Sequence, residues 1–542
     1  MDAKYGFLTV KGLEDMFIPM LRNCKSTGFM KKIHAQIVKF SLSQSNYLVT
    51  KMIEICDKLG EVDYASLLFK QVEEPNNYLY NCMIRAYTNR QRYVPCINIY
   101  KQMMEQTQSD ETTISPDEYT YPFVIRSCGG LLCVNLGKQF HGQVCKFGLK
   151  SSSVIENSLL DMYVKCDQMS YAHKLFEEMS ERDVISWNSL ISGHIKLRQV
   201  RKARALFEEM PNKTVVSWTA MIAGYTKTGC YGDALDVFRR MQMVGMKPDW
   251  ISLVAVLPAC AQLGALELGK WIHFYAEKYG YLRKTSVCNA LMEMYAKCGS
   301  VNQAWQLFNE MSERDVISWS TMIGGLANHG RAHEALKLFH EMQRSVVEPN
   351  EITFVGLLCA CAHAGLVKDG LRYFDSMKND YNIEPRIEHY GCLVDLLGRT
   401  GRLERALALI KSMPVKPDSA IWGSLLSSCR THRNLEIAVI AMEHLLELEP
   451  EDTGNYILLA NIYADLGKWD GVSRMRKFIR SKCMKKTPGC SLIEVNSVVQ
   501  EFLSGDDSKP FSKDIHQVLE LLAFHQSKEN DLVDITLEYL SP

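Results

Sequence analysis

Small polar side chains occupy one variable position after an otherwise constant stretch of this sequence. The stretch EMSERDVISW occurs at 178–187 and again at 310–319, and it is followed by Asn188 in the first copy and by Ser320 in the second. A shorter copy, VVSW at 215–218, is followed by Thr219. An amide and a hydroxyl can each donate and accept hydrogen bonds. We therefore interpret the constant residues as a scaffold and the variable ones as residues that read a ligand.

The sequence lacks the patterns of common catalytic and metal sites. None of the 14 His is followed two positions later by Glu, and no two of the 18 Cys are spaced as CxxC. Zinc-dependent cytidine deamination needs both patterns, with the His and two Cys as ligands and the Glu as general acid and base. No P-loop or dinucleotide fingerprint is present. We expect no catalytic residues, no metal and no cofactor.

The composition restricts the partners. The chain has 542 residues, of which 47% are hydrophobic and 23% charged, as in soluble folded proteins. Lys plus Arg and Asp plus Glu both number 62, so the chain lacks the overall positive charge that binds duplex DNA. This balance does not exclude a groove that binds single-stranded nucleic acid. The most apolar window, 250–264, is too short to cross a membrane. We expect no DNA partner, no membrane, and reduced, buried thiols in a reducing compartment.

Internal repeats organise the chain. Trp187 and Trp218 are 31 residues apart, and Trp187 and Trp319 are 132 apart. MYVKC at 162–166 and MYAKC at 294–298 are also 132 residues apart. Mixed repeat lengths of 31 and 35 residues account for both offsets. We therefore expect an array of similar structural units.

Each repeat carries an apolar stripe with helical spacing. The pattern Ala-x-x-Leu-Phe-x-x-Met or a close variant recurs, and its i, i+3, i+4, i+7 spacing covers one face of a helix. A similar stripe precedes it, so each repeat predicts a helical hairpin that must stack on its neighbours, in a solenoid of either hand. Tetratricopeptide, HEAT-like and pentatricopeptide arrays all fit this description. The pattern occurs at Ala172/Leu175/Phe176/Met179, Ala203/Leu206/Phe207/Met210, Ala234/Val237/Phe238/Met241, Ala304/Leu307/Phe308/Met311 and Ala335/Leu338/Phe339/Met342.

The ends and motifs of the repeats resemble one family. The 35-residue repeats end in Pro plus Asp or Asn, as in SPD at 115–117, KPD at 247–249 and EPN at 348–350. With CAQLGALELGKWIH, YAKCGSVNQAWQLF and IEHYGCLVDLLGRTGRLERALALI, the chain resembles plant pentatricopeptide-repeat (PPR) proteins of the PLS class, E/E+ subgroup, over 46–486 and beyond. The resemblance implies an all-α, right-handed superhelical solenoid of helix-turn-helix hairpins.

The resemblance also implies a division of the chain. Residues 1–45 are expected to be a presequence or degenerate repeat, 46–418 the array of P, L and S repeats, 419–486 two extension motifs (E1 and E2), 487–510 the further E+ extension, and 511–542 a tail. The array divides into 46–76, 77–117 (with an insertion near 107–113), 118–152, 153–183, 184–214, 215–249, 250–284, 285–315, 316–350, 351–386 and 387–418.

In this family each repeat faces one RNA base, which is read mainly by the fifth and last residues of the repeat. A small hydroxyl at the fifth position leaves room for a purine and Asn reaches a pyrimidine; a last Asp accepts from U or G, whereas Asn donates to A or C. Apolar second residues such as Ile185, Val216 and Ile317 would wedge between bases. The implied pairs are Thr50/Asn76 (A), Asn81/Asp117 (U), Asn157/Asp183 (U), Asn188/Thr214 (pyrimidine only), Thr219/Asp249 (G), Asn289/Asp315 (U) and Ser320/Asn350 (A).

These pairs predict the RNA 5′-A-U-n-U-Y-G-n-U-A-n-n-3′, read parallel to the protein. The long repeats, 118–152, 250–284 and 351–386, and the final Gly391/Asp418 lie outside the simple code. For any single Asn or Asp the alternative is a helix cap or turn residue, since both types are favoured there. All the pairs occupy the same two positions of their repeats, which favours base reading over helix capping alone.

The segments after residue 418 resemble the extensions of RNA-editing factors. The second, 453–486, also resembles a tetratricopeptide unit, with Asn455, Tyr456, Leu459, Tyr463 and Trp469 patterned like a peptide-binding hairpin. Residues 472–486 include seven basic and no acidic residues, which suits either a solvated helix face or contact with an RNA backbone. Residues 489–510 resemble the extension that precedes a deaminase domain in longer relatives, and we expect that domain to be absent here.

The resulting hypothesis is a single-stranded RNA-binding factor that specifies a cytidine for C-to-U editing in an organellar transcript. The resemblance implies a DYW-type deaminase acting in trans and multiple organellar RNA editing factor proteins as partners. The alternatives are an RNA stabilisation or splicing factor and a tetratricopeptide-like protein scaffold. The first 25 residues, with four basic and three acidic side chains, match a transit peptide weakly. Family frequency favours the mitochondrion, with the chloroplast as the alternative.

Overall fold

The computed structural model describes residues 10–107, 114–149, 152–482, 489–495, 498–504, 506, 508 and 513–525. The start of the expected presequence, the insertion at 108–113, parts of the further extension and most of the tail lie outside the described residues. The described chain divides into two compact bodies, which are considered separately. The first body holds residues up to Cys230 together with Val237–Lys247, and the second holds Tyr231–Asp236 together with the chain from Pro248 onward.

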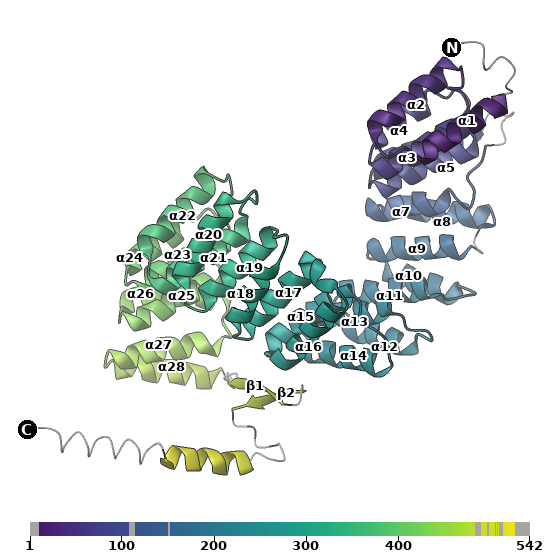
Figure 1. Cartoon of the computed structure of the whole chain (residues 1–542). Coiled ribbons are helices and arrows are strands. Elements are labelled where there is room, and N and C mark those ends of the chain that lie inside the picture. The colour runs from purple at the N-terminus through teal and green to yellow at the C-terminus, as the bar shows by residue number, and fades with distance from the viewer. Residues whose placement is uncertain are drawn as a thin grey trace, which may run out of the picture. The chain divides into compact units, whose positions relative to one another are not determined.

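Antiparallel helix pairs make up both bodies, and the fold is an all-α solenoid (Figure 1). Within each body, the first helix of one pair packs against the first helix of the next. The helices of the first body are α1(Val10–Arg22), α2(Thr27–Lys39), α3(Asn46–Leu59), α4(Val62–Lys70), α5(Asn77–Asn89), α6(Tyr93–Thr107), α7(Tyr121–Gly130), α8(Val134–Lys146), α9(Ser153–Lys165), α10(Met169–Glu178), α11(Val184–Lys196), α12(Val200–Glu209) and α13(Val215–Lys227).

Helix α14(Tyr231–Met243) contains residues of both bodies. The second body continues with α15(Trp250–Leu263), α16(Leu266–Lys278), a 3-10 turn at Tyr281–Arg283, α17(Thr285–Lys297), α18(Val301–Glu310), α19(Val316–Asn328), α20(Ala332–Arg344), α21(Glu351–Ala364), α22(Val367–Asn379), α23(Ile387–Arg399), α24(Leu403–Ser412), α25(Ser419–Thr431), α26(Leu435–Leu448), α27(Thr453–Asp465) and α28(Trp469–Ser481). Residues 513–525 are also helical.

The apolar stripe of the second helices forms the core, as its spacing predicts. Ala172, Leu175, Phe176 and Met179 are all at most 5% exposed. The Trp of the constant stretch packs edge-on against the Phe of the preceding stripe, with ring centroids 4.8 Å apart for Trp187 and Phe176. Each hairpin therefore buries its stripe partly within itself and partly under the next hairpin.

The rest of the constant stretch joins consecutive hairpins. Arg182 donates from Nε to the carbonyl of Phe176 (3.0 Å) and from Nη2 to that of Glu177 (3.3 Å), which satisfies acceptors at the end of α10. Arg314 makes the same two bonds to Phe308 and Asn309, at 2.9 and 3.0 Å. The stretch EMSERDVISW is therefore conserved within the chain because it ends one helix, caps the next and packs the Trp between them.

Most first helices begin at the first residue of a predicted repeat, but α7 begins at Tyr121 rather than at Glu118. Asp117 accepts hydrogen bonds from the amides of Tyr119 and Thr120, both at 3.0 Å, and so forms a turn before the helix. Pro122 occupies the first turn of α7, where the missing amide proton costs nothing.

A two-stranded antiparallel sheet follows the last helix pair. Strand β1(Cys490–Val495) pairs with β2(Val498–Leu503), with Cys490 opposite Leu503 and Val495 opposite Val498. The Glu494 carboxylate accepts hydrogen bonds from the amides of Glu267 (2.8 Å) and Leu268 (3.1 Å) in the first turn of α16. An acidic side chain is favourable at this end of a helix because unpaired amides and the helix dipole meet there.

The cysteines that the structure describes form no disulfide, and many are buried. Burial raises the pKa of Cys56 and of Cys392 to about 12, so both thiols stay protonated. The expectation of buried thiols is wrong for Cys133, Cys145, Cys230 and Cys490, which are exposed. Among the described helices, none is long and apolar enough to span a bilayer.

Candidate nucleic-acid interface

The last residue of a predicted repeat, with the exception of Asp117, is the N-cap of the next first helix in the structure. Asp183 accepts from the amide of Ser186 at 2.8 Å, and Asp315 from that of Ser318 at 2.8 Å. The capping interpretation of these residues therefore holds. Each cap uses one carboxylate oxygen, so it does not exclude a second role for the other. Asn76, Asp183, Thr214, Asp249, Asp315 and Asn350 are the N-caps of α5, α11, α13, α15, α19 and α21.

The fifth residue of a repeat lies on its first helix, and in three repeats its amide donates directly to the last residue. Asn157 Nδ2 is 2.8 Å from Asp183 Oδ2, and Asn289 Nδ2 is 3.0 Å from Asp315 Oδ1. Asn81 Nδ2 lies 3.0 and 3.1 Å from the two carboxylate oxygens of Asp117. The sequence prediction paired residues that the tertiary structure brings into hydrogen-bonding contact.

Several polar atoms at these positions lack a partner. The Oδ1 atoms of Asn157, Asn188 and Asn289 are buried and accept no hydrogen bond within the described structure. In contrast, Asn81 Oδ1 accepts from the Thr120 hydroxyl at 2.6 Å. A buried acceptor without a donor is costly. A donor from a ligand, after a small rotation of the amide, would remove that cost.

The carboxylate of Asp315 stays ionised near neutral pH. Burial acts to raise its pKa, but hydrogen bonds from the Ser318 amide, the Asn289 side chain, the Ser318 hydroxyl and the Ile317 amide together outweigh burial and lower the pKa. An ionised carboxylate only accepts hydrogen bonds. Asp315 is thus suited to a ring N–H and unsuited to a bare ring nitrogen.

Ser320 and Asn350 line a cleft between α19 and α21 with a volume of about 630 Å³. The Ser320 hydroxyl contacts Asn350 Oδ1 at 3.4 Å and the Thr353 hydroxyl at 2.8 Å. Ile317 and Ile352, the second residues of this repeat and the next, line the same cleft and are 54% and 65% exposed. A flat base can stack between two such side chains while its edge faces the polar pair.

The first body contains a similar cleft at Asn81 and Asp117, with a volume of about 530 Å³. Tyr78 and Tyr119 line it and are 56% and 67% exposed. The sequence interpretation assigned wedge roles to Ile185, Val216 and Ile317 and missed these tyrosines. Their position as second residues of their repeats was the available signal. The large apolar second residues exposed in the structure are Tyr47, Tyr78, Tyr119, Val154, Ile185, Val216, Ile251, Ile317 and Ile352, whereas two repeats have the polar second residues Ser286 and Glu388.

Three of the predicted pairs differ from the rest. Thr50 is 1% exposed, and its hydroxyl donates to the carbonyl of Asn46 at 2.7 Å, as that of Ser320 does to Val316, but Thr50 makes no hydrogen bond to Asn76 within the described structure. Thr214 forms a capping box with Ser217, with the two hydroxyls 3.2 Å apart. Thr219 belongs to the first body and Asp249 to the second, so each of these two residues is described within its own body. Asp249 caps α15 through the Ser252 amide at 2.8 Å.

Two of the five residues of the peptide-binding pattern in the second extension motif are part of its core, and Asn455 and Tyr463 are half-buried. Tyr456 and Leu459 are 3% and 4% exposed, and Tyr456 stacks on Phe478 with ring centroids 5.1 Å apart. Trp469 is 68% exposed. The basic side chains of α28, Arg474, Arg476, Lys477 and Arg480, are exposed as well.

Known proteins match the chain along nearly its whole length. The pentatricopeptide repeat-containing protein At2g20540 of Arabidopsis thaliana is 62% identical over 523 residues, which cover 96% of this chain and 97% of the relative. The chain belongs to the pentatricopeptide-repeat proteins. The putative pentatricopeptide repeat-containing protein At5g59200, chloroplastic, of the same plant is 42% identical and covers 96% of this chain and 94% of its own length.

Family models locate the repeats of this PPR protein. The model described as PPR repeat matches 78–106, 157–184, 185–215, 286–316, 352–381 and 388–416, and the PPR repeat family model matches 213–262 and 314–363. A third model, the E motif, matches 432–494, so the chain is of the E subgroup. Among solved structures, the crystal structure of PPR10 from maize aligns with a TM-score of 0.49 at 15% identity, covering 87% of this chain and 78% of that chain.

Proposed function

We propose that this PPR protein binds one single-stranded organellar RNA by sequence and specifies a cytidine in it for C-to-U editing. The bases would face successive repeats in the order 5′-A-U-n-U-Y-G-n-U-A-n-n-3′. Each base would stack on the exposed second residues and present its edge to the fifth and last residues. The alternation of 31- and 35-residue repeats supports the PLS class, and the E motif at 432–494 supports the editing role.

The observation that carries the proposal is the polar pair at the fifth and last residues of a repeat, which at Ser320 and Asn350 lies between two exposed apolar side chains. At Asn289 and Asp315 the amide and carboxylate meet at 3.0 Å, and one amide oxygen has no partner. At Ser320 and Asn350 a cleft of about 630 Å³ lies between Ile317 and Ile352. A protein scaffold would not need the pair residues to vary among Asn, Ser, Thr and Asp at fixed positions while the surrounding stretch stays constant.

The editing step requires a partner. The residues needed for a zinc deaminase site do not occur in this sequence as HxE and CxxC, so a DYW-type deaminase would act in trans on a cytidine 3′ of the last repeat. The extension after residue 418 would recruit it, together with multiple organellar RNA editing factor proteins. The organelle would be the mitochondrion, with the chloroplast as the alternative that the printed name of At5g59200 favours.

The decisive experiment changes one last residue and one base together. The full chain is titrated by fluorescence anisotropy with the 11-nucleotide RNA at fixed salt, with either A or G at its ninth base. Wild type is expected to favour A, because Asn350 can donate to the bare ring nitrogen of adenine. Asn350→Asp is expected to favour G, because a carboxylate accepts from the ring N–H, with a switch of about tenfold in each direction.

Asn379→Asp, an exposed Asn at the end of α22, is the matched control and should leave the preference for A unchanged. Binding that ignores the ninth base in all three proteins contradicts the proposed reading. Absence of binding to any RNA favours the protein scaffold instead. Base-dependent binding without editing of a reporter cytidine in organelle extract favours RNA stabilisation or splicing.

A further inference from the structure

The last helix of the second extension motif, α28, has an exposed face that combines one aromatic side chain with several basic ones. Trp469, Ser473, Arg476 and Arg480 are spaced i, i+4, i+7 and i+11, so they form one stripe along the helix. All four are exposed, and Trp469 is 68% exposed. The stripe extends about 17 Å at roughly 1.5 Å per residue. It is a continuous surface on one side of α28.

The basic side chains of this face have no counter-ion. Among the described residues, no carboxylate forms an ion pair with Arg476, Lys477 or Arg480. Asp465, at the end of the partner helix α27, lies instead 3.7 Å from Arg430. The positive charge of α28 is therefore available to a ligand.

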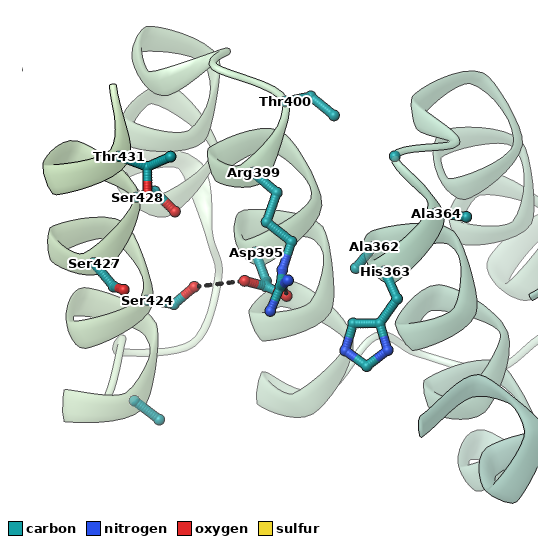
Figure 2. Close-up of a pocket in the computed structure, with 12 residues that line it drawn as sticks. Ala362, His363, Ala364, Asp395, Arg399, Thr400, Ser424, Ser427, Ser428 and Thr431 are labelled. Carbon is teal, nitrogen blue, oxygen red and sulfur yellow. Dashed lines mark hydrogen bonds and ion pairs between the residues drawn. The ribbon is translucent and has the colours of Figure 1, made fainter. Parts of the chain in front are cut away.

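The unpaired cations of α28 differ from basic side chains elsewhere in the second body. Figure 2 shows Arg399 beside Asp395, and Arg399 Nε donates to Asp395 Oδ2 at 2.7 Å. Lys297 Nζ likewise lies 2.8 Å from Glu293, four residues earlier on the same helix. The single acidic residue of α28, Asp470, is in the first turn, where the helix dipole favours it. The basic stripe beyond that turn is not balanced within the helix.

Unpaired cations beside an exposed indole suit a single-stranded nucleic acid. Cations bind the phosphates whatever the base, and an aromatic side chain offers a flat surface on which a base of any type can stack. An acidic protein surface would pair with Arg476 and Arg480, but it would offer no ring to stack on Trp469. The combination of charge and ring therefore favours RNA as the ligand of this face.

The place of α28 in the chain selects the segment of RNA. Helix α23 of the last repeat contacts α25, α25 contacts α27, and α27 pairs with α28, the last helix pair before the strands (Figure 1). An RNA that is read parallel to the protein has its 3′ end at the last repeat. The nucleotides that follow the eleven read bases therefore continue toward the extension.

We propose that the face of α28 formed by Trp469, Arg476, Lys477 and Arg480 binds the RNA 3′ of the eleven bases that the array reads, without regard to base sequence. This inference rests on the proposed function. It gives the second extension motif an RNA-binding role that is separate from the recruitment of a deaminase.

The test compares the 11-nucleotide RNA with two 19-nucleotide RNAs, which add eight uridines to its 3′ or to its 5′ end. The full chain is titrated with each RNA by fluorescence anisotropy at several salt concentrations. Wild type should bind the 3′-extended RNA about tenfold more tightly than the other two. The double change Arg476→Gln with Arg480→Gln should remove this gain. It should also reduce the slope of log K against log salt by about 1.4, on the 3′-extended RNA alone.

Two further variants separate stacking from charge. Trp469→Ala should reduce the gain about fivefold and leave the salt slope unchanged, because stacking on a base releases no counter-ions. Lys337→Gln with Arg344→Gln removes two exposed cations from α20, the second helix of another repeat, and is the matched control. This control should keep the full gain from the 3′ extension.

Equal affinities of wild type for the 3′-extended and the 11-nucleotide RNA would overturn the inference and would favour an acidic protein as the ligand of this face. A gain that survives the change of both arginines, or an equal gain from the 5′ extension, would also overturn it. The ninth-base experiment with Asn350→Asp tests the proposed function on the 11-nucleotide RNA alone, so the two failures are distinguishable.

Discussion

At the residue scale, one histidine pair departs from the pattern of its neighbours. His141 meets Tyr163 and His273 meets Tyr295, each through Nδ1 at 2.9 Å from the phenol oxygen, across the boundary between two hairpins. At the next boundary after Tyr163 the tyrosine is replaced by His194, whose Nε2 is 2.7 Å from that of His173. Two imidazoles at this distance can share one proton but cannot both be protonated favourably.

This pair makes the first body sensitive to acid. Burial lowers the pKa of His194 below its ordinary value, repulsion from His173 and Lys202 adds to this, and the hydrogen bond that His194 Nδ1 donates to Gln199 Oε1 opposes it. The unfolded chain therefore binds the proton more readily, so stability is lost as the pH falls below about 6.5. His194→Tyr should reduce the fall in Tm between pH 7.5 and 5.5, as measured by circular dichroism.

The matched control is His340→Tyr, which changes an exposed histidine on α20 and should leave the acid sensitivity as it is. If the Tm of wild type and of His194→Tyr falls by the same amount between pH 7.5 and 5.5, the buried histidine pair does not cause the acid sensitivity.

At the element scale, the side chain of Glu494 joins the hairpin β1–β2 to α16. The amides of Glu267 and Leu268 donate to the Glu494 carboxylate, which lies 227 and 226 residues further along the chain, respectively. Residues of the hairpin strands such as Leu492, Ile493 and Leu503 stay exposed, so little buried apolar surface supports this contact. The carboxylate is therefore the principal polar link between the extension and this long repeat.

Removal of that carboxylate should loosen both partners. Glu494→Ala leaves two amides at the start of α16 without an acceptor, a local loss of about 1 kcal/mol for a helix cap. Hydrogen exchange by mass spectrometry should show faster exchange at 266–269 and across the hairpin. Ser491→Ala, an exposed change on the same strand, should show neither effect. Unchanged exchange at 266–269 in Glu494→Ala would mean that the hairpin does not cap α16 in solution.

At the scale of the whole molecule, the array is a sum of similar hairpins, and each contacts mainly its neighbours. The repeat 285–315 is a complete hairpin, α17 with α18, followed directly by α19. If this hairpin is removed, the hairpin α19–α20 takes its place against the preceding repeat. The two hairpins have equivalent apolar stripes, since Phe308 of the deleted one and Phe339 of the next are both in the core. The RNA sequence that the array recognises should then be one base shorter.

A chain lacking 285–315 should prefer the RNA from which the eighth base, U, has been deleted. Competition between the 10- and 11-nucleotide RNAs, with wild type as the reference, measures this preference by anisotropy. A deleted chain that still prefers the longer RNA would contradict one base per repeat.

The helical hairpins and their boundaries could be read from the sequence because both depend on local signals. Spacing of i, i+3, i+4 and i+7 defines a buried helix face wherever it occurs, and Asp or Asn before an apolar run marks a helix start. Asp183, Asp315 and Asn350 were thus expected at helix starts, and each is the N-cap of a helix. The late start of α7 was missed, since it depends on a turn at Asp117 that mere spacing does not reveal.

The sequence by itself determined the repeat and the all-α fold, because a period of 31 or 35 residues places equivalent positions in equivalent surroundings. Only the tertiary structure decided which pairs touch and which atoms are left without a partner. In the tertiary structure the Thr50 hydroxyl bonds to a carbonyl of its own helix, Asn289 donates to Asp315, and Gly391 lines a cleft. Those outcomes depend on the distance between neighbouring helices, and that distance is set by side chains from several repeats at once.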